Sequence, residues 1–123
     1  VLMDVEPYTS NNRVYPNDDY IVLVALLGMD TSDGDPIDFS PSNVNTSSLK
    51  FGPAQAPNVI STINTDVDGD GNSDRIYGFN MQNSGIFCGD TELEMTGNLY
   101  NGLPIEATDM IVPEDCETGG CHP

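Results

Sequence analysis

The chain has 123 residues, of which 37% are hydrophobic and 19% charged, so it is long enough for one globular domain with a single core. Twenty acidic residues against three basic ones give a formal net charge of −17 and a pI near 4.1. Such a surface repels phosphate backbones and anionic headgroups, which argues against binding nucleic acid or a membrane surface. The longest apolar run, "YIVLVALLGM", is about half the ~18 residues that a spanning helix needs, so membrane insertion is not expected.

Turn-forming clusters separate short segments rich in Val, Ile, Leu, Tyr, Phe and Thr, which is typical of a β-sandwich. "ELEMTGN" alternates as a half-buried strand does, whereas "IVLVALL" is apolar on both faces and predicts a central strand covered on both sides. "SPSNVNTSSL" favours one short helical turn. Strands are expected near residues 2–5, 20–27, 48–51, 58–64, 75–81, 92–98 and 107–112. The predicted fold is all-β: a single β-sandwich, Ig-like or jelly-roll-like, of about seven to eight short strands with one calcium-binding hairpin loop.

The stretch "TDVDGDGNSD" places carboxylates at alternating positions between two predicted strands. Counted from Asp66, acidic side chains fall at positions 1, 3, 5 and 9, with Gly71 at 6. Calcium takes six to eight oxygen ligands, and this spacing sends every second side chain inward while glycine permits the turn. The predicted calcium ligands are Asp66, Asp68, Asp70, the backbone carbonyl of Asn72, and Asp74.

Several alternatives to this calcium loop are less favourable. A solvated loop without an ion would leave four carboxylates repelling one another. An EF-hand would carry Glu where this chain has Tyr77, and the flanks are strand-like rather than helical. Magnesium demands stricter octahedral geometry, and zinc would require His or Cys. We expect the ion to act structurally, by holding two strands in register.

Two further acidic stretches are weaker candidates for outer or second metal ligands. "MDTSDGDPIDF" contains Asp30 and offers Asp33, Asp35 and Asp38 as possible ligands, but its spacing is irregular and Pro36 interrupts it, so a solvated turn is the favoured interpretation. "CGDTELE" offers Asp90, which would join the first site if the strands brought it there.

The three cysteines, Cys88, Cys116 and Cys121, leave one thiol over in any single pairing. In an oxidising compartment a Cys88–Cys116 disulfide would tie the tail to the body of the domain, Cys88–Cys121 would compete, and three reduced thiols would indicate a cytosolic protein. We expect a domain over residues 1–116 and a flexible C-terminal tail over residues 117–123. No basic start followed by an apolar stretch is present, so we expect any signal peptide to have been removed or to lie upstream in a larger protein.

Segments across nearly the whole chain resemble a module appended to large secreted and surface proteins of marine and environmental bacteria. The matching segments are "MDVEPYTSNNRVYPNDDYIVLVALLGMD", "VNTSSLKFGPAQA", "DVDGDGNSDRIYGF", "SGIFCGDTELEMTG" and "NGLPIEATDMI". The resemblance implies a secreted or cell-surface, calcium-binding, noncatalytic β-sandwich in which a cysteine near Cys116 accompanies Cys88. Cys121 and the segment "VEPY" depart from the pattern.

Three classes of function are then compared. The first is a noncatalytic, calcium-stabilised accessory or adhesion module that contacts neighbouring domains of a parent protein. The second is a carbohydrate-binding module of a secreted polysaccharide-degrading enzyme, with a polysaccharide or cell-surface glycan as partner; the chain has no Trp for a sugar platform, and its five tyrosines are scattered. An enzyme is disfavoured, because the single histidine, His122, is the penultimate residue and no carboxylate pair stands out.

Overall fold

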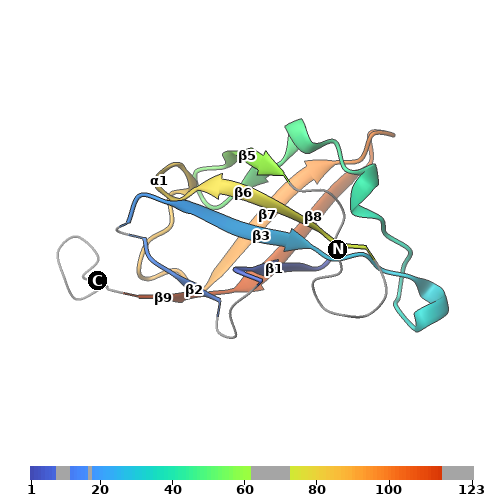
Figure 1. The fold of residues 1–123 in the computed structure, drawn as a ribbon, viewed down its shortest axis with the longest axis horizontal. Helices are drawn as coiled ribbons and strands as arrows, with labels where there is room; N and C mark the ends of the chain where they lie inside the picture. The colour runs from blue at the N-terminus through green and yellow to red at the C-terminus, as the bar shows by residue number, and fades with distance from the viewer. Residues whose placement is uncertain (8–11, 17, 62–72, 115–123) are drawn as a thin grey trace.

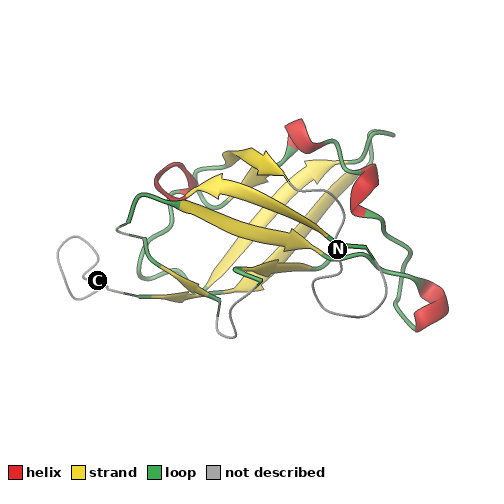
Figure 2. Cartoon of the chain, viewed as in Figure 1, coloured by secondary structure: helices red, strands yellow, loops and turns green. Residues whose placement is uncertain are grey.

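The computed structural model describes residues 1–7, 12–16, 18–61 and 73–114. Nearly all regular structure in these ranges is β-strand, with single helical turns in the connections (Figure 2). The strands are β1 (Met3–Val5), β2 (Arg13–Val14), β3 (Ile21–Leu26), β4 (Lys50–Phe51), β5 (Ala56–Ser61), β6 (Arg75–Asn80), β7 (Glu92–Asn98), β8 (Pro104–Met110) and β9 (Val112–Pro113). The turns are η1 (Thr31–Asp33), η2 (Pro41–Asn43), η3 (Thr46–Ser48) and α1 (Met81–Ser84).

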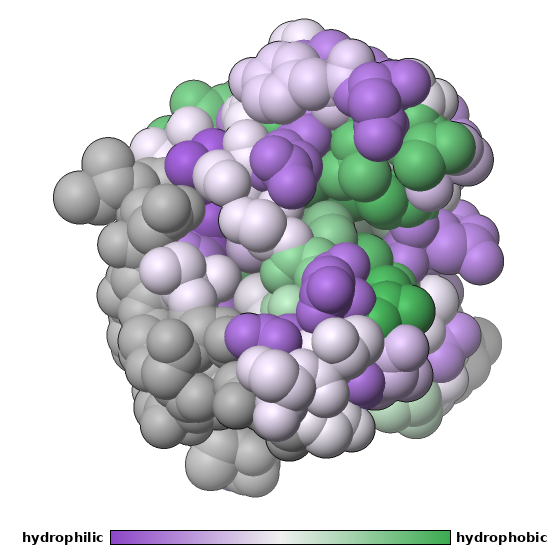
Figure 3. All heavy atoms as spheres, turned by 90° about the vertical axis from the view of Figure 1, so that its right-hand side faces the viewer, coloured by the Kyte–Doolittle hydropathy of each residue, from purple (hydrophilic) through white to green (hydrophobic). Residues whose placement is uncertain are grey.

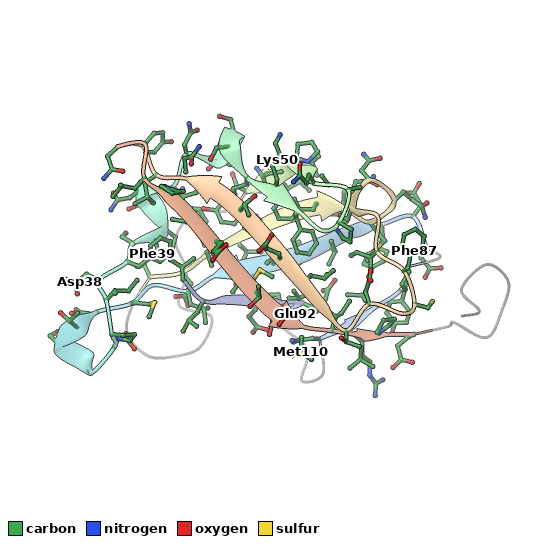
Figure 4. All side chains as sticks on the ribbon, turned by 180° about the vertical axis from the view of Figure 1, so that it is seen from behind. Asp38, Phe39, Lys50, Phe87, Glu92 and Met110 are labelled. Atoms are coloured by element: carbon green, nitrogen blue, oxygen red, sulfur yellow. The ribbon has the colours of Figure 1, made fainter. Side chains whose placement is uncertain are left out.

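Seven strands form one antiparallel sheet in the order β1-β3-β6-β5-β4-β7-β8. The sheet folds over at β4 and β5, so that β7 and β8 lie behind β3 and β6 (Figure 1). Figure 4, which is seen from behind, shows β7 and β8 in front of β3 and β6. β2 and β9 form a separate parallel pair. The predicted all-β fold is confirmed.

The two edge strands, β1 and β8, approach each other and nearly close the sheet. The Val1 amino group donates to the Glu106 carbonyl at 3.2 Å, and the Val5 amide donates to Asp109 Oδ2 at 2.9 Å. The same carboxylate oxygen accepts from Asn12 Nδ2 at 2.8 Å. Asp109 therefore satisfies donors from two other segments where backbone pairing between β1 and β8 is missing.

The core lies between the two layers and follows the alternation of the strands. Tyr77 and Phe79 of β6 are fully buried on the inner face, and Phe79 stacks on Phe51 with ring centroids 4.8 Å apart. Leu93 and Met95 of β7 close the core from the other layer, as their alternation with Glu92 and Glu94 predicts. Each such side chain contributes roughly 1.5–3 kcal/mol by burial.

β3 is the central strand that its apolar sequence predicts, since it pairs with β1 on one side and β6 on the other. Val22, Val24 and Leu26 are fully buried in the core. On the opposite face Ile21 and Leu23 are half-buried, so coverage of that face is partial. Ile21 Cγ2 lies 2.7 Å from where a Cβ on Gly78 would stand, so glycine permits this close approach between β3 and β6.

Each of the seven predicted segments overlaps a strand, but boundaries and short elements differ. β5 begins at Ala56 and β8 at Pro104, earlier than predicted, and the short pair β2 and β9 was not predicted. Pro104 is compatible with the first position of a strand that has a free edge. The turn predicted in "SPSNVNTSSL" is present as η2 and η3, while α1 was not foreseen.

The connections divide between two ends of the sandwich. β5 and β7 run in the same direction, because both are antiparallel to β4, and their connections to β6 and β8 leave at one end, here called the hairpin end. β3 also finishes there, since Leu26 pairs with Arg75 at the start of β6. The opposite end, here called the α1 end, carries α1 and the turn after β4 (Figure 1).

Candidate metal centre

The acidic stretch lies in the connection between β5 and β6, which are neighbouring antiparallel strands. The sequence prediction that this stretch joins two paired strands is therefore confirmed. Asp66, Asp68, Asp70 and Asn72 fall outside the described residues, and their role as calcium ligands stays a prediction. Asp74, the last member of the set, is described.

Asp74 is fully buried at the point where the connection enters β6. Its Oδ1 accepts a hydrogen bond of 2.7 Å from the Gly28 amide. This contact follows from the register of β3 and β6. Leu26 and Arg75 are paired, so the residues that follow Leu26 lie beside the residue that precedes Arg75. A buried carboxylate loses its hydration and needs donors or a cation in exchange, so its position at the base of an acidic hairpin fits a metal site.

The second acidic stretch follows β3 and lies at the same end of the sandwich. The Gly28–Asp74 hydrogen bond joins the start of this stretch to the base of the β5–β6 hairpin. Figure 4 shows Asp38 and Phe39 at this end of the molecule, with Phe87 at the other. The fold thus brings two acidic segments, distant in sequence, to one end.

The described carboxylates of the second stretch bond within their own loop. Asp35 Oδ2 accepts from the Asp30 amide at 2.9 Å, and Asp38 Oδ1 accepts from the Thr31 amide at 2.8 Å. The hydrogen bond from Thr31 lowers the pKa of the exposed Asp38 carboxyl. Asp33 ends η1, and its side chain lies outside the described atoms. These bonds are those of a capped turn, in agreement with the interpretation favoured from the sequence.

Asp90 lies at the α1 end, beyond the far end of β6 from Asp74. Its Oδ2 accepts from the Phe87 amide at 2.9 Å, and its own amide donates to the Phe87 carbonyl at 3.0 Å. β6 has six residues, so about 20 Å of extended strand separates the two ends. The structure does not bring Asp90 to the candidate metal centre.

Cys88 lies in the turn between α1 and β7, and its sulfur is disulfide-bonded. The other two cysteines of the chain, Cys116 and Cys121, lie outside the described residues. The pairing of Cys88 with Cys116 therefore stays a prediction.

Within the described ranges, no three His, Cys, Asp or Glu side chains are grouped so as to hold a metal ion. Four of the five predicted ligands lie outside those ranges, so this result does not test the hairpin. The five predicted ligands would offer only oxygen atoms, which are the ligands that calcium prefers, and the last of them, Asp74, is buried. No helix in the described part is long and apolar enough to cross a membrane.

Sequence reasoning missed two features that the topology creates. Asp109 bridges the seam between β1 and β8, which no local pattern indicates. Tyr100, treated in the sequence as one of five scattered tyrosines, is 72% exposed in the β7–β8 hairpin. The "YNG" sequence was a signal for it, because Asn-Gly marks a tight turn and a turn residue projects into solvent.

Comparison with known proteins gives no family. No protein-family model matches the chain, and neither the curated proteins nor the solved structures include a match. The fold and the site together define an all-β protein with a nearly closed antiparallel sheet and an acidic hairpin at one end of it.

Proposed function

We infer that this chain is a noncatalytic, calcium-stabilised accessory or adhesion module of a larger extracellular protein, in contact with neighbouring domains of that protein. The observation that carries the proposal is Asp74, a fully buried carboxylate at the base of a hairpin with three more aspartates at alternating positions. A divalent cation there would offset the repulsion among these groups and the net charge of −17.

The proposed role of the ion is to stabilise the hairpin end. An ion bound by the β5–β6 connection would also bind Asp74. Asp74 in turn accepts the hydrogen bond from the Gly28 amide, just after β3. One ion would then restrain three strands that meet at this end. A secreted or cell-surface location suits such a site, since calcium there is abundant, and the disulfide at Cys88 is consistent with an oxidising compartment.

Thermal unfolding with calcium and with a chelator tests this proposal. An ion bound only by the folded state adds about 2.7 kcal/mol when its concentration is about 100-fold above Kd. For a domain of this size that corresponds to about 10 °C in Tm. We expect the chelator to lower Tm by about this amount, and titration calorimetry to show calcium binding.

Two matched variants locate the ion. Asp68→Asn removes one predicted ligand, and we expect it to abolish most of the calcium-dependent shift in Tm. Asp90→Asn removes a carboxylate from the α1 end and should leave the shift unchanged. Equal Tm values for the wild type with calcium and with chelator would overturn the proposal.

A second candidate function is carbohydrate binding, as in a module of a polysaccharide-degrading enzyme. The specific observation in its favour is the exposed ring of Tyr100 in a depression that Asn43 and Asn101 also line.

A further inference from the structure

The tip of the β7–β8 hairpin is held by the segment that contains η2 and η3. The Tyr100 amide donates to the Asn43 carbonyl at 2.9 Å, and the Asn45 amide donates to the Asn98 carbonyl at 2.9 Å. The Asn98 amide in turn donates to Ser48 Oγ at 2.8 Å. These bonds connect residues about fifty positions apart, so the surface that they form is fixed by the fold rather than by a free loop.

Tyr100 presents its ring to solvent on this support. Its side chain is 72% exposed, whereas the neighbouring Leu99 packs against the core. Tyr100, Asn43 and Asn101 line a shallow depression of about 270 Å³ together with Leu99. Asn101 Oδ1 accepts from the Leu103 amide at 3.0 Å, which fixes the side-chain amide and leaves its NH2 group to donate.

A larger groove lies along the base of the same hairpin. It measures about 490 Å³, which is within the range of small-molecule sites. Polar side chains of Ser48, Thr96, Asn98 and Glu106 line it together with the apolar Pro104 and Ile105. Figure 3 faces the hairpin end of the molecule and shows apolar atoms exposed among hydrophilic ones.

The two depressions share the hairpin and combine an exposed aromatic ring with amide and hydroxyl groups. A sugar ring has an apolar face that can stack on tyrosine and hydroxyls that pair with amides, so these features match a saccharide. Glu106 is the one charged residue among the described residues that line either depression. A cationic protein partner would find little charge to pair with here, and the net charge of −17 repels anionic polysaccharides.

We propose that the hairpin tip and the groove at its base form a binding site for a neutral polysaccharide, with Tyr100 as the stacking platform and Asn43 and Asn101 as hydrogen-bonding groups. The site is built from β7, β8, η2 and η3, none of which belongs to the acidic hairpin. The proposal therefore does not rest on bound calcium and is tested separately from it.

Affinity electrophoresis of the full chain tests the site, with soluble galactomannan, xyloglucan, mixed-linkage β-glucan and arabinoxylan as neutral probes. We expect at least one probe to retard the wild type. Tyr100→Ala should weaken that binding by about tenfold, as the loss of one aromatic contact predicts. Asn43→Ala should weaken it to a smaller extent.

Phe87→Ala is the matched control, because Phe87 is also an exposed aromatic, at 68%, but lies at the α1 end. It should bind the retarding probe as the wild type does. An unchanged Tm for Tyr100→Ala shows that its loss of binding is not a loss of fold. The proposal is overturned if no neutral probe retards the wild type, if Tyr100→Ala binds equally well, or if the anionic polysaccharide alginate is bound as strongly as the neutral probes.

Discussion

The two ends of the sandwich are stabilised in different ways. At the α1 end, backbone segments are in close contact: the Ala54 amide donates to the Ser84 carbonyl at 3.0 Å, and Asn80 Oδ1 caps α1 by accepting from the Asn83 amide at 3.1 Å. Burial raises the pKa of Tyr20 to about 12 at this end, where its hydroxyl accepts from the Tyr15 amide. Backbone contacts hold much of this end together, although Phe87 is exposed there and a depression of about 230 Å³ lies beside Gly52 and Pro53.

At the hairpin end, by contrast, two acidic segments meet and the larger depressions lie. A fully buried carboxylate, an exposed tyrosine and a groove of about 490 Å³ lie there. The α1 end is therefore stabilised mainly by contacts within the chain. The hairpin end carries the groups that we propose bind a calcium ion and a polysaccharide.

Glycine substitutions should have the largest effect on the free energy of unfolding, and the effect should differ between the two ends. Gly52 has φ +78°, and an added Cβ would lie 2.5 Å from the Ser84 carbonyl oxygen, so Gly52→Ala should cost about 3–4 kcal/mol of unfolding free energy. Gly102 at the hairpin tip has φ +89° with no atom within 4 Å of an added Cβ, and Gly102→Ala should cost about 1 kcal/mol. Urea unfolding measures both, and equal losses would contradict the tight packing at the α1 end.

Amide hydrogen exchange should localise the effect of calcium. If the ion holds the hairpin, exchange of the Gly28 amide, which donates to Asp74, should slow by up to about 100-fold at a calcium concentration about 100-fold above Kd. The Ala54 amide at the α1 end should change much less. Uniform slowing at both ends would show that the ion does not act locally.

Removal of the Asp109 carboxylate should open the seam between β1 and β8. Asp109→Ala leaves the Val5 amide without its acceptor and removes one of the two hydrogen bonds that Asn12 Nδ2 donates, the other going to the Met110 carbonyl, which should cost about 2 kcal/mol. Asp109→Asn keeps one acceptor oxygen and should lose less. Chemical unfolding measures the free energy of unfolding of the two variants, with Thr108→Ala, an exposed neighbour, as the control. If Thr108→Ala lost as much unfolding free energy as Asp109→Ala, Asp109 would not be what stabilises the seam between β1 and β8.

The smallest expected effect is the pH dependence of Asp4 in β1. Burial, with a further contribution from the nearby Asp109 charge, raises the pKa of Asp4 above its ordinary value. A raised folded-state pKa means that the stabilising contribution is complete below the ordinary pKa and is lost as pH rises through the folded value. At neutral pH Asp4→Asn should therefore stabilise the fold, by less than about 1 kcal/mol because Asp4 is partly solvated.

This gain should disappear as pH falls below about 4, where Asp4 is protonated in both states. Thermal unfolding of the variant and the wild type across this range measures the difference. A gain that is independent of pH would contradict the role of ionisation.

The main strands could be predicted from the sequence, because short apolar segments lie between turn-forming clusters. In β7 the alternation also indicated the buried face, which carries Leu93 and Met95, whereas β6 is buried on both faces, Ile76 as well as Tyr77 and Phe79. β2 and β9 could not be predicted, because a pair of two-residue strands has no periodicity of its own. Their pairing depends on neighbours such as Asn12, which donates to Asp109 far along the chain.

The candidate sites divide in the same way. The spacing of the aspartates predicted a hairpin between two strands, and the strands on either side of it are paired as expected. Asp90 has an equally acidic neighbourhood in the sequence but lies at the other end of β6. Tyr100 and Asn43 form one surface although 57 positions separate them (100 − 43), and their backbones are joined by a hydrogen bond.

The class of fold and the place of the acidic hairpin between two strands could be predicted from residue spacing alone, because spacing along a strand or a short loop decides which side chains share a face. Tertiary structure alone decided which connections meet at the same end, since that depends on strand order. The order β1-β3-β6-β5-β4-β7-β8 places Gly28 beside Asp74 and nearly closes the sheet through Asp109. These contacts join distant segments, and their geometry is fixed only when the whole core has packed.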